Sequence, residues 1–136
     1  QRMNLESTCS CGQWQAKITV TKPPKELTPR ICDCDYCQCY PSSVVSDPSM
    51  VVDFIGGTAH IKKNGDRLAN FYHCDCCDDF LAVGCYINGV LHGAVNSNLF
   101  GDIDPFGKPV NIQPRFLSAN EKMERWEGLW GILNGV

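Results

Sequence analysis

Apolar and polar side chains alternate most regularly between residues 14 and 20. Every second side chain in this stretch is apolar: Trp14, Ala16, Ile18 and Val20. Because successive side chains of a strand point to opposite faces of its sheet, a period of two predicts a half-buried β-strand. Residues 50–55 form a short, β-branched apolar run between the turn signals Asp47-Pro48 and Gly56-Gly57. This run predicts a second, buried strand.

Two Asn-Gly pairs predict tight hairpins. Asn64-Gly65 separates the strand-like stretches 58–63 and 67–73, and Asn88-Gly89 lies between strand-like runs at 80–87 and 89–95. Asparagine and glycine tolerate the positive φ values that two-residue hairpin turns require. We therefore expect four further strands, joined in two antiparallel pairs.

The last third of the chain carries one helix signal. Ser118 and Glu121 have the spacing of a capping box, which predicts a helix that starts after Ser118, runs through about residue 126 and ends near Gly128. The prolines between residues 21 and 30 exclude regular structure there, and the Gly- and Pro-containing stretch 96–109 predicts a loop. The expected fold is mainly β, with several short antiparallel strands and hairpins, one short C-terminal helix and a single domain over residues 1–136.

The charge distribution excludes some classes of partner. The 136-residue chain has a net charge of −3 at pH 7 and no run of like charge. It therefore offers no basic surface for nucleic acid or an anionic membrane. No apolar run approaches the eighteen or so residues of a membrane helix, and the first ten residues lack the apolar centre of a signal peptide. We expect a soluble, cytoplasmic protein.

The cysteines carry most of the chemical information. Ten of them occur in the chain, and most stand close together in pairs: Cys9/Cys11, Cys32/Cys34, Cys37/Cys39, Cys74/Cys76 and Cys76/Cys77. Disulfides between such near neighbours are strained and form rarely. Metal ligation in a reducing compartment therefore explains the spacing better than the alternative, a secreted domain stapled by disulfides.

The first candidate metal site comprises Cys32, Cys34 and Cys37. In an extended backbone residues 32 and 34 point to the same side, and a short turn can bring Cys37 to the same point. Three thiolates around a zinc ion leave a fourth position for water or substrate, which distinguishes a catalytic site from a structural one. Cys39 leaves an alternative open, because as a fourth ligand it would close the site into a structural cluster.

The second candidate site joins two distant pairs. Cys9-Ser10-Cys11-Gly12 offers two same-side sulfurs and a glycine that permits a tight turn, and Cys74-x-x-Cys77 has the spacing of a zinc knuckle. A structural zinc site needs four ligands, so the two pairs together would tie the N-terminal strand to the first hairpin. An alternative pairs Cys74 with Cys76 and leaves Cys77 free.

The candidate residues outside the cysteine motifs are expected to have structural roles. Trp14 is expected to anchor the core, and Cys85, in an apolar run, to be a small buried hydrophobe. A histidine in a strand is usually a hydrogen-bonded structural residue, although His73 is a stronger ligand candidate than His60 because it adjoins Cys74. His92 has no expected role.

The order of the cysteine motifs resembles the glutathione-dependent formaldehyde-activating enzyme family, which shares its domain with centromere protein V and has the Mss4-like β fold. The resemblance covers nearly the whole chain, through Cys9-Ser10-Cys11-Gly12, Cys32-Asp33-Cys34-Asp35-Tyr36-Cys37, Cys74 to Cys77 and Val110-Asn111-Ile112. It implies two zinc ions. The structural one would be held by Cys9, Cys11, Cys74 and Cys77, and the catalytic one by Cys32, Cys34 and Cys37.

Two departures from the family pattern stand out. Asp78 occupies the position after the last C-x-x-C where the family usually has glycine, and Cys39-Tyr40-Pro41-Ser42-Ser43 replaces a small, glycine-containing segment. Cys39 and Cys76 have no counterpart in the pattern. The pocket beside the central site is therefore expected to differ from that of the family.

The resemblance implies a zinc-dependent carbon–sulfur lyase or synthase that acts on an aldehyde adduct of glutathione or another small thiol, such as S-hydroxymethylglutathione. A zinc ion held by three thiolates is a weak Lewis acid, but it can bind a further thiol as thiolate or the oxygen of a thiohemiacetal. The candidate partners for the glutathione carboxylates are Arg30, Lys62, Lys63, Arg67, Lys108 and Arg115. The alternative function is a non-catalytic Mss4-like zinc module that binds a protein partner.

Overall fold

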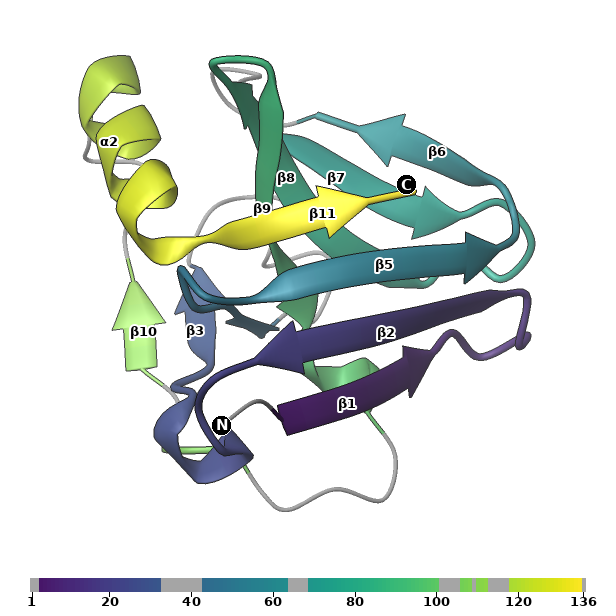
Figure 1. The fold of residues 1–136 in the computed structure, drawn as a ribbon. Coiled ribbons are helices and arrows are strands. Elements are labelled where there is room, and N and C mark those ends of the chain that lie inside the picture. Colours follow the sequence, from purple (N-terminus) through teal and green to yellow (C-terminus); the bar gives the residue numbers. More distant parts are fainter. Residues whose placement is uncertain are drawn as a thin grey trace.

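The computed structural model describes residues 3–32, 43–63, 69–100, 106–108, 110–112 and 118–135. Over these ranges the fold is mainly β, as the sequence predicts, with one α-helix near the C-terminal end (Figure 1). The strands are β1 (Met3–Thr8), β2 (Trp14–Val20), β3 (Arg30–Cys32), β4 (Val44–Val45), β5 (Val51–Gly56), β6 (Ala59–Lys62), β7 (Asn70–Cys74), β8 (Phe80–Ile87), β9 (Val90–Asn96), β10 (Val110–Ile112) and β11 (Gly131–Asn134). The helices are the 3₁₀ turns η1 (Pro24–Glu26) and η2 (Ser97–Leu99) and the α-helix α2 (Ala119–Leu129).

The described strands belong to one branched sheet. Its main path runs β1-β2-β5-β11-β9-β4-β3-β10, and β8, β7 and β6 continue from β9 (Figure 1). Most neighbours are antiparallel, but β11 pairs in parallel with β5, and β10 pairs in parallel with β3. The predicted antiparallel strands are thus present, and two parallel pairs occur beside them. Parallel neighbours need a long connection, and both of these pairs join strands far apart in sequence.

The strands with clear periodicity lie where the sequence predicts them. The alternating stretch at 14–20 is β2, and its apolar side chains are buried while most of the intervening ones are exposed. Asn88 and Gly89 form the two-residue turn between β8 and β9, with φ values of +53° and +81°. The hairpin of β6 and β7 also forms, although its Asn64-Gly65 turn lies outside the described residues.

Three features differ from the sequence expectation. Strand β1 was not predicted because the N-terminal segment is polar, yet Leu5 and Ser7 are buried where β1 pairs with β2. The segment at 21–30 was expected to be irregular, but it contains η1 and the first residue of β3. Strand β11 was also missed. Gly131 opens β11 at a point where a Cβ atom would collide with the carbonyl oxygen of Met50, so only glycine allows this close approach to the start of β5.

Two buried clusters form the core. The larger contains Trp14, which is 5% exposed and packs edge-on against Phe54. Cys9 and Cys74 belong to this same cluster, so the ends of the strands that carry them rest on the core. The smaller cluster includes Cys85 and lies where α2 packs on β8 and β9. Both Trp14 and Cys85 therefore have the buried roles predicted for them.

Helix α2 begins as the capping box predicts. The backbone N–H of Glu121 donates to the Ser118 hydroxyl over 3.2 Å, and the Ser118 N–H donates to the Glu121 carboxylate over 3.1 Å. The helix continues to Leu129, slightly beyond the predicted end. Over the described ranges, no helix is both long enough and apolar enough to cross a membrane.

Candidate metal centre

The first half of the site is the turn between β1 and β2. Gly12 has φ +78°, and its N–H donates to the carbonyl oxygen of Cys9 over 3.0 Å. This left-handed backbone, which glycine adopts without steric cost, reverses the chain within four residues. The N–H of Trp14 then points back to the Cys9 sulfur at 3.4 Å. The turn therefore presents Cys9 and Cys11 together, as the C-x-C-G pattern predicts.

The second half is the knuckle between β7 and β8. The N–H of Asp78 donates to the carbonyl of Cys74 over 2.9 Å, and the N–H of Cys76 lies 3.4 Å from the Cys74 sulfur. Asp78 has φ +60°, in the left-handed region. Glycine adopts this region most readily and aspartate tolerates it, so the backbone at position 78 suits either residue.

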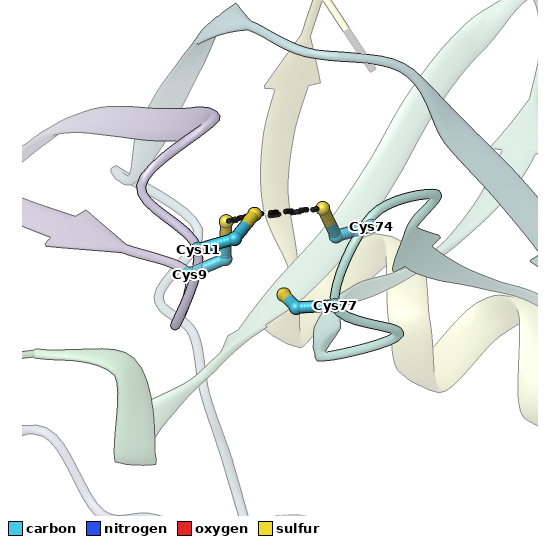
Figure 2. A group of neighbouring side chains, drawn as sticks. All are labelled: Cys9, Cys11, Cys74 and Cys77. Atoms are coloured by element: carbon cyan, nitrogen blue, oxygen red, sulfur yellow. Dashed lines mark hydrogen bonds between the residues drawn. The ribbon is translucent and has the colours of Figure 1, made fainter.

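The two halves bring four sulfurs to one point. The sulfur of Cys9 lies 3.5 Å from that of Cys11 and 3.9 Å from that of Cys74, and Cys11 and Cys74 are 3.6 Å apart. All four sulfurs, including that of Cys77, lie within 4.8 Å of one another (Figure 2). A tetrahedral zinc ion with Zn–S bonds of about 2.3 Å separates its sulfurs by about 3.8 Å. The four side chains can therefore hold a metal ion with little rearrangement.

The cluster bears on which cysteine completes the second pair. Cys77 joins the other three sulfurs, whereas Cys76 is exposed and lies outside the group. This grouping favours the C-x-x-C interpretation over the alternative C-x-C pairing. The six cysteines whose side chains are described are free thiols, including the four that face one another. This favours metal ligation over a disulfide-stapled domain.

Ionisation of the thiols shows why the cluster suits a cation. Burial opposes ionisation of Cys9, but hydrogen bonds from the Trp14 amide and the neighbouring thiols lower its pKa to about 7. A backbone hydrogen bond at Gln13 favours the Cys11 thiolate, yet desolvation and the adjacent sulfurs raise its pKa above the ordinary range. Burial likewise raises the pKa of Cys74. Neighbouring thiolates repel one another, and a bound divalent cation would remove this penalty.

Two hydrogen bonds between Ser10 and Asp79, here called the Ser10–Asp79 latch, join the two loops beside the sulfurs. The backbone N–H and the hydroxyl of Ser10 both donate to Oδ2 of Asp79, over 2.7 and 2.6 Å. Ser10 stands between Cys9 and Cys11, and Asp79 follows the knuckle. Sequence reasoning missed this pair, because nothing in the local pattern links two residues that are far apart in the chain. The latch therefore connects the loop that carries Cys9 and Cys11 to the loop that carries Cys74 and Cys77.

We expect the substitution Asp79→Ala to lower the affinity of the cluster for zinc by about tenfold, the lower end of the effect of removing a direct partner of a ligand, because Asp79 bonds to Ser10 between two cysteines and not to a sulfur. The measurement is competition with a chromophoric chelator. Glu6→Ala, which removes an exposed carboxylate from β1 outside the latch, is the matched control and should leave the affinity unchanged. Equal affinities for the Asp79 variant and the control would show that the latch does not position the ligands.

The histidines form a separate group beside the knuckle. Nδ1 of His60 lies 2.8 Å from Asp75, and its Nε2 lies 3.0 Å from Asp78, whose other oxygen is 3.2 Å from the Lys62 ammonium. His73 is fully buried, and its Nδ1 donates to the Asp78 carbonyl over 2.9 Å. Although ligand atoms of His60, His73 and Asp78 also lie within 4.8 Å, these contacts already occupy the atoms a metal would need. The structural interpretation of both histidines is therefore favoured.

The central candidate site falls largely outside the described residues. Cys34, Cys37 and Cys39 lie in the range 33–42, and only the backbone of Cys32 is described, as the last residue of β3. β3 pairs with β4 and β10, and Cys32 is opposite Ile112 in the latter pair. The predicted Val110-Asn111-Ile112 motif is thus the strand β10, which lies beside the first cysteine of the central site.

Comparison with known proteins supports the fold alone. No protein-family model matches the chain, and no curated protein sequence matches it. The chain resembles the crystal structure of a Rhodobacter sphaeroides protein from a structural genomics programme, with a TM-score of 0.56 and 17% sequence identity. The match covers 78% of this chain and 100% of the other. At this identity the likeness concerns the arrangement of the strands and carries no activity with it.

Proposed function

We propose that this protein is a zinc-dependent enzyme that forms or cleaves a carbon–sulfur bond in the aldehyde adduct of a small thiol such as glutathione. Its structural zinc ion would be bound by the cluster of Cys9, Cys11, Cys74 and Cys77. Its catalytic zinc ion would be bound by Cys32, Cys34 and Cys37. A cytoplasmic location suits free thiols, because that compartment is reducing.

The observation that carries the proposal is the four-sulfur cluster. It assembles the four cysteines that the family resemblance assigns to a structural metal, from two loops more than sixty residues apart. Because a tetrahedral structural site is complete with four sulfurs, this cluster has no need of the central cysteines. The central trio would then form a separate set of ligands, with one position to spare if Cys39 is not a ligand.

The proposed reaction needs no oxidant or reductant. The thiol sulfur bonds to the aldehyde carbon, the carbonyl electron pair moves to oxygen, and the proton lost by the thiol is returned to that oxygen. Zinc at the central site would lower the pKa of the incoming thiol and so supply its thiolate form. Strand β3, paired on both edges, would fix the backbone of the first ligand and hold the reacting partners in position.

Cobalt substitution tests the proposal. We expect two metal ions per chain, and adding glutathione to the cobalt protein should strengthen the thiolate-to-cobalt charge-transfer absorption as an eighth sulfur binds. The same sample should speed the reaction of glutathione with formaldehyde above the uncatalysed rate. Two bound ions with no spectral response to glutathione and no rate increase would contradict the enzyme proposal. Such a result would favour a closed site in a protein-binding zinc module.

A further inference from the structure

A half-buried guanidinium lies where β3, β4 and α2 meet. Nη1 of Arg30 donates to the hydroxyl of Ser46 over 3.3 Å, and this hydroxyl donates to the carbonyl oxygen of Leu129 over 3.0 Å. Ser46 directly follows β4, and Leu129 is the last residue of α2. The contact uses one of the five N–H groups of the guanidinium, and no other hydrogen bond of it is formed with the described residues.

This guanidinium has no anionic partner among the residues whose positions are described. The nearby carboxylate of Asp47 is engaged elsewhere, because it lies 2.9 Å from the Lys22 ammonium and accepts the backbone N–H of Ser49 over 3.0 Å. Burial and the positive charge of Arg125 lower the pKa of Arg30, and the charge of Asp47 offsets this only in part. A partly desolvated cation without a counter-ion is costly, and an anionic ligand would relieve that cost.

The second cation comes from the helix. Arg125 lies four residues before Leu129 in α2, so both occupy the same face of the helix, one turn apart. Its side chain is exposed, and over the described ranges it forms no ion pair. The hydrogen bonds through Ser46 join Arg30 to the last turn of α2, which carries Arg125, and the charge of Arg125 acts on Arg30, on a chain whose net charge is −3. Two guanidinium groups, one of them half-buried, are suited to binding a carboxylate through charge-assisted hydrogen bonds.

We propose that Arg30 and Arg125 form a binding site for a carboxylate of the small thiol substrate. This inference rests on the proposed function, because it gives that substrate an anionic end. Arg30 stands two residues before Cys32 in β3, a distance of about 7 Å along an extended strand. A tripeptide-sized thiol with its carboxylate on the arginines could thus reach the backbone position of Cys32.

The other cations considered from the sequence fit less well. The ammonium of Lys62 lies 3.2 Å from Asp78. Lys62 belongs to β6, the edge strand of the branch that leads from β9 through β8 and β7, and not to the branch that contains β3. Lys108 is exposed, and Arg67 and Arg115 lie outside the described residues. Arg125 did not emerge from the sequence at all. Only the packing of α2 against the sheet brings it near Arg30.

Binding of S-methylglutathione to the zinc-loaded protein tests the inference. Its blocked sulfur cannot bind as a thiolate, so its affinity reports on the carboxylates. Arg125→Gln should weaken binding about tenfold in isothermal titration calorimetry, the loss expected for one charge-assisted contact. Because Arg125 is exposed, the thermal midpoint of the variant should not change. Lys17→Gln, which removes one positive charge from an exposed site on β2, is the matched control and should bind like the parent protein.

The outcomes separate this inference from the proposed function. Equal affinity in the parent protein and the Arg125 variant, or equally tight binding of the S-methylglutathione diethyl ester, would overturn the carboxylate site while leaving the thiol chemistry untouched. An Arg125-dependent affinity in a protein that shows no turnover would support the site and count against the enzyme proposal. Loss of thermal stability without loss of affinity would assign the arginines a purely structural role and overturn the inference.

Discussion

Replacing Cys77 by serine should lower the thermal midpoint of the zinc-loaded protein by on the order of 10 °C or more. The substitution leaves three sulfurs in the cluster and weakens the proposed metal link between the β1–β2 turn and the knuckle after β7. Metal binding at a structural site contributes directly to folding free energy, so a weaker site means a less stable fold. Circular dichroism during heating, with zinc content measured in parallel, checks this.

Cys76→Ser provides a closely matched control. Cys76 is the neighbouring residue, but its side chain is exposed and outside the cluster, and only its backbone N–H contacts the Cys74 sulfur. Because serine keeps that N–H, the stability of this variant should stay within about 0.5 kcal/mol of the parent protein. If the Cys76 and Cys77 variants lost stability equally, the assignment of the fourth ligand would be wrong. If neither lost any, the cluster would not support the fold.

The local elements could be predicted because their signals are local. The alternation in β2, the Asn-Gly turn between β8 and β9, and the capping box of α2 each depend on residues within one short stretch. The C-x-C and C-x-x-C spacings are local in the same sense, since they determine which sulfurs point together before the chain folds. These signals were sufficient to predict the mainly β fold and the joining of the two cysteine pairs, whereas the choice of Cys77 over Cys76 came from the family resemblance.

The rest depends on contacts between distant segments. Strand β1 is polar and becomes a strand because β2 offers it a partner, and β11 is recognisable only once β5 and β9 are in place on either side of it. The Ser10–Asp79 latch and the approach of Arg125 to Arg30 likewise arise from tertiary packing. Periodicity and motif spacing contain no information on such pairings, which explains why sequence analysis missed all of them.

The proposed assignment of the two sets of cysteines to a structural and a catalytic zinc ion predicts a second, opposite phenotype. Cys37→Ser should reduce turnover of the glutathione–formaldehyde reaction at least about a hundredfold, because losing a ligand costs more than losing an outer partner of one. The thermal midpoint should fall far less than in the Cys77 variant, since the four-sulfur cluster is intact. Turnover, zinc content and melting curves of the two variants are to be measured side by side.

Cys39→Ser decides whether the central site has a free position. If Cys39 is not a ligand, this variant should retain both zinc ions and its turnover, while Cys37→Ser loses activity. If instead the Cys39 variant releases the central zinc, that ion has four protein sulfurs and no room for a thiol, and the enzyme proposal fails. Were Cys37→Ser to unfold as readily as Cys77→Ser, both sets of cysteines would be structural. The open coordination position, rather than the number of cysteines, is therefore what distinguishes an enzyme from a zinc-stabilised binding module in this chain.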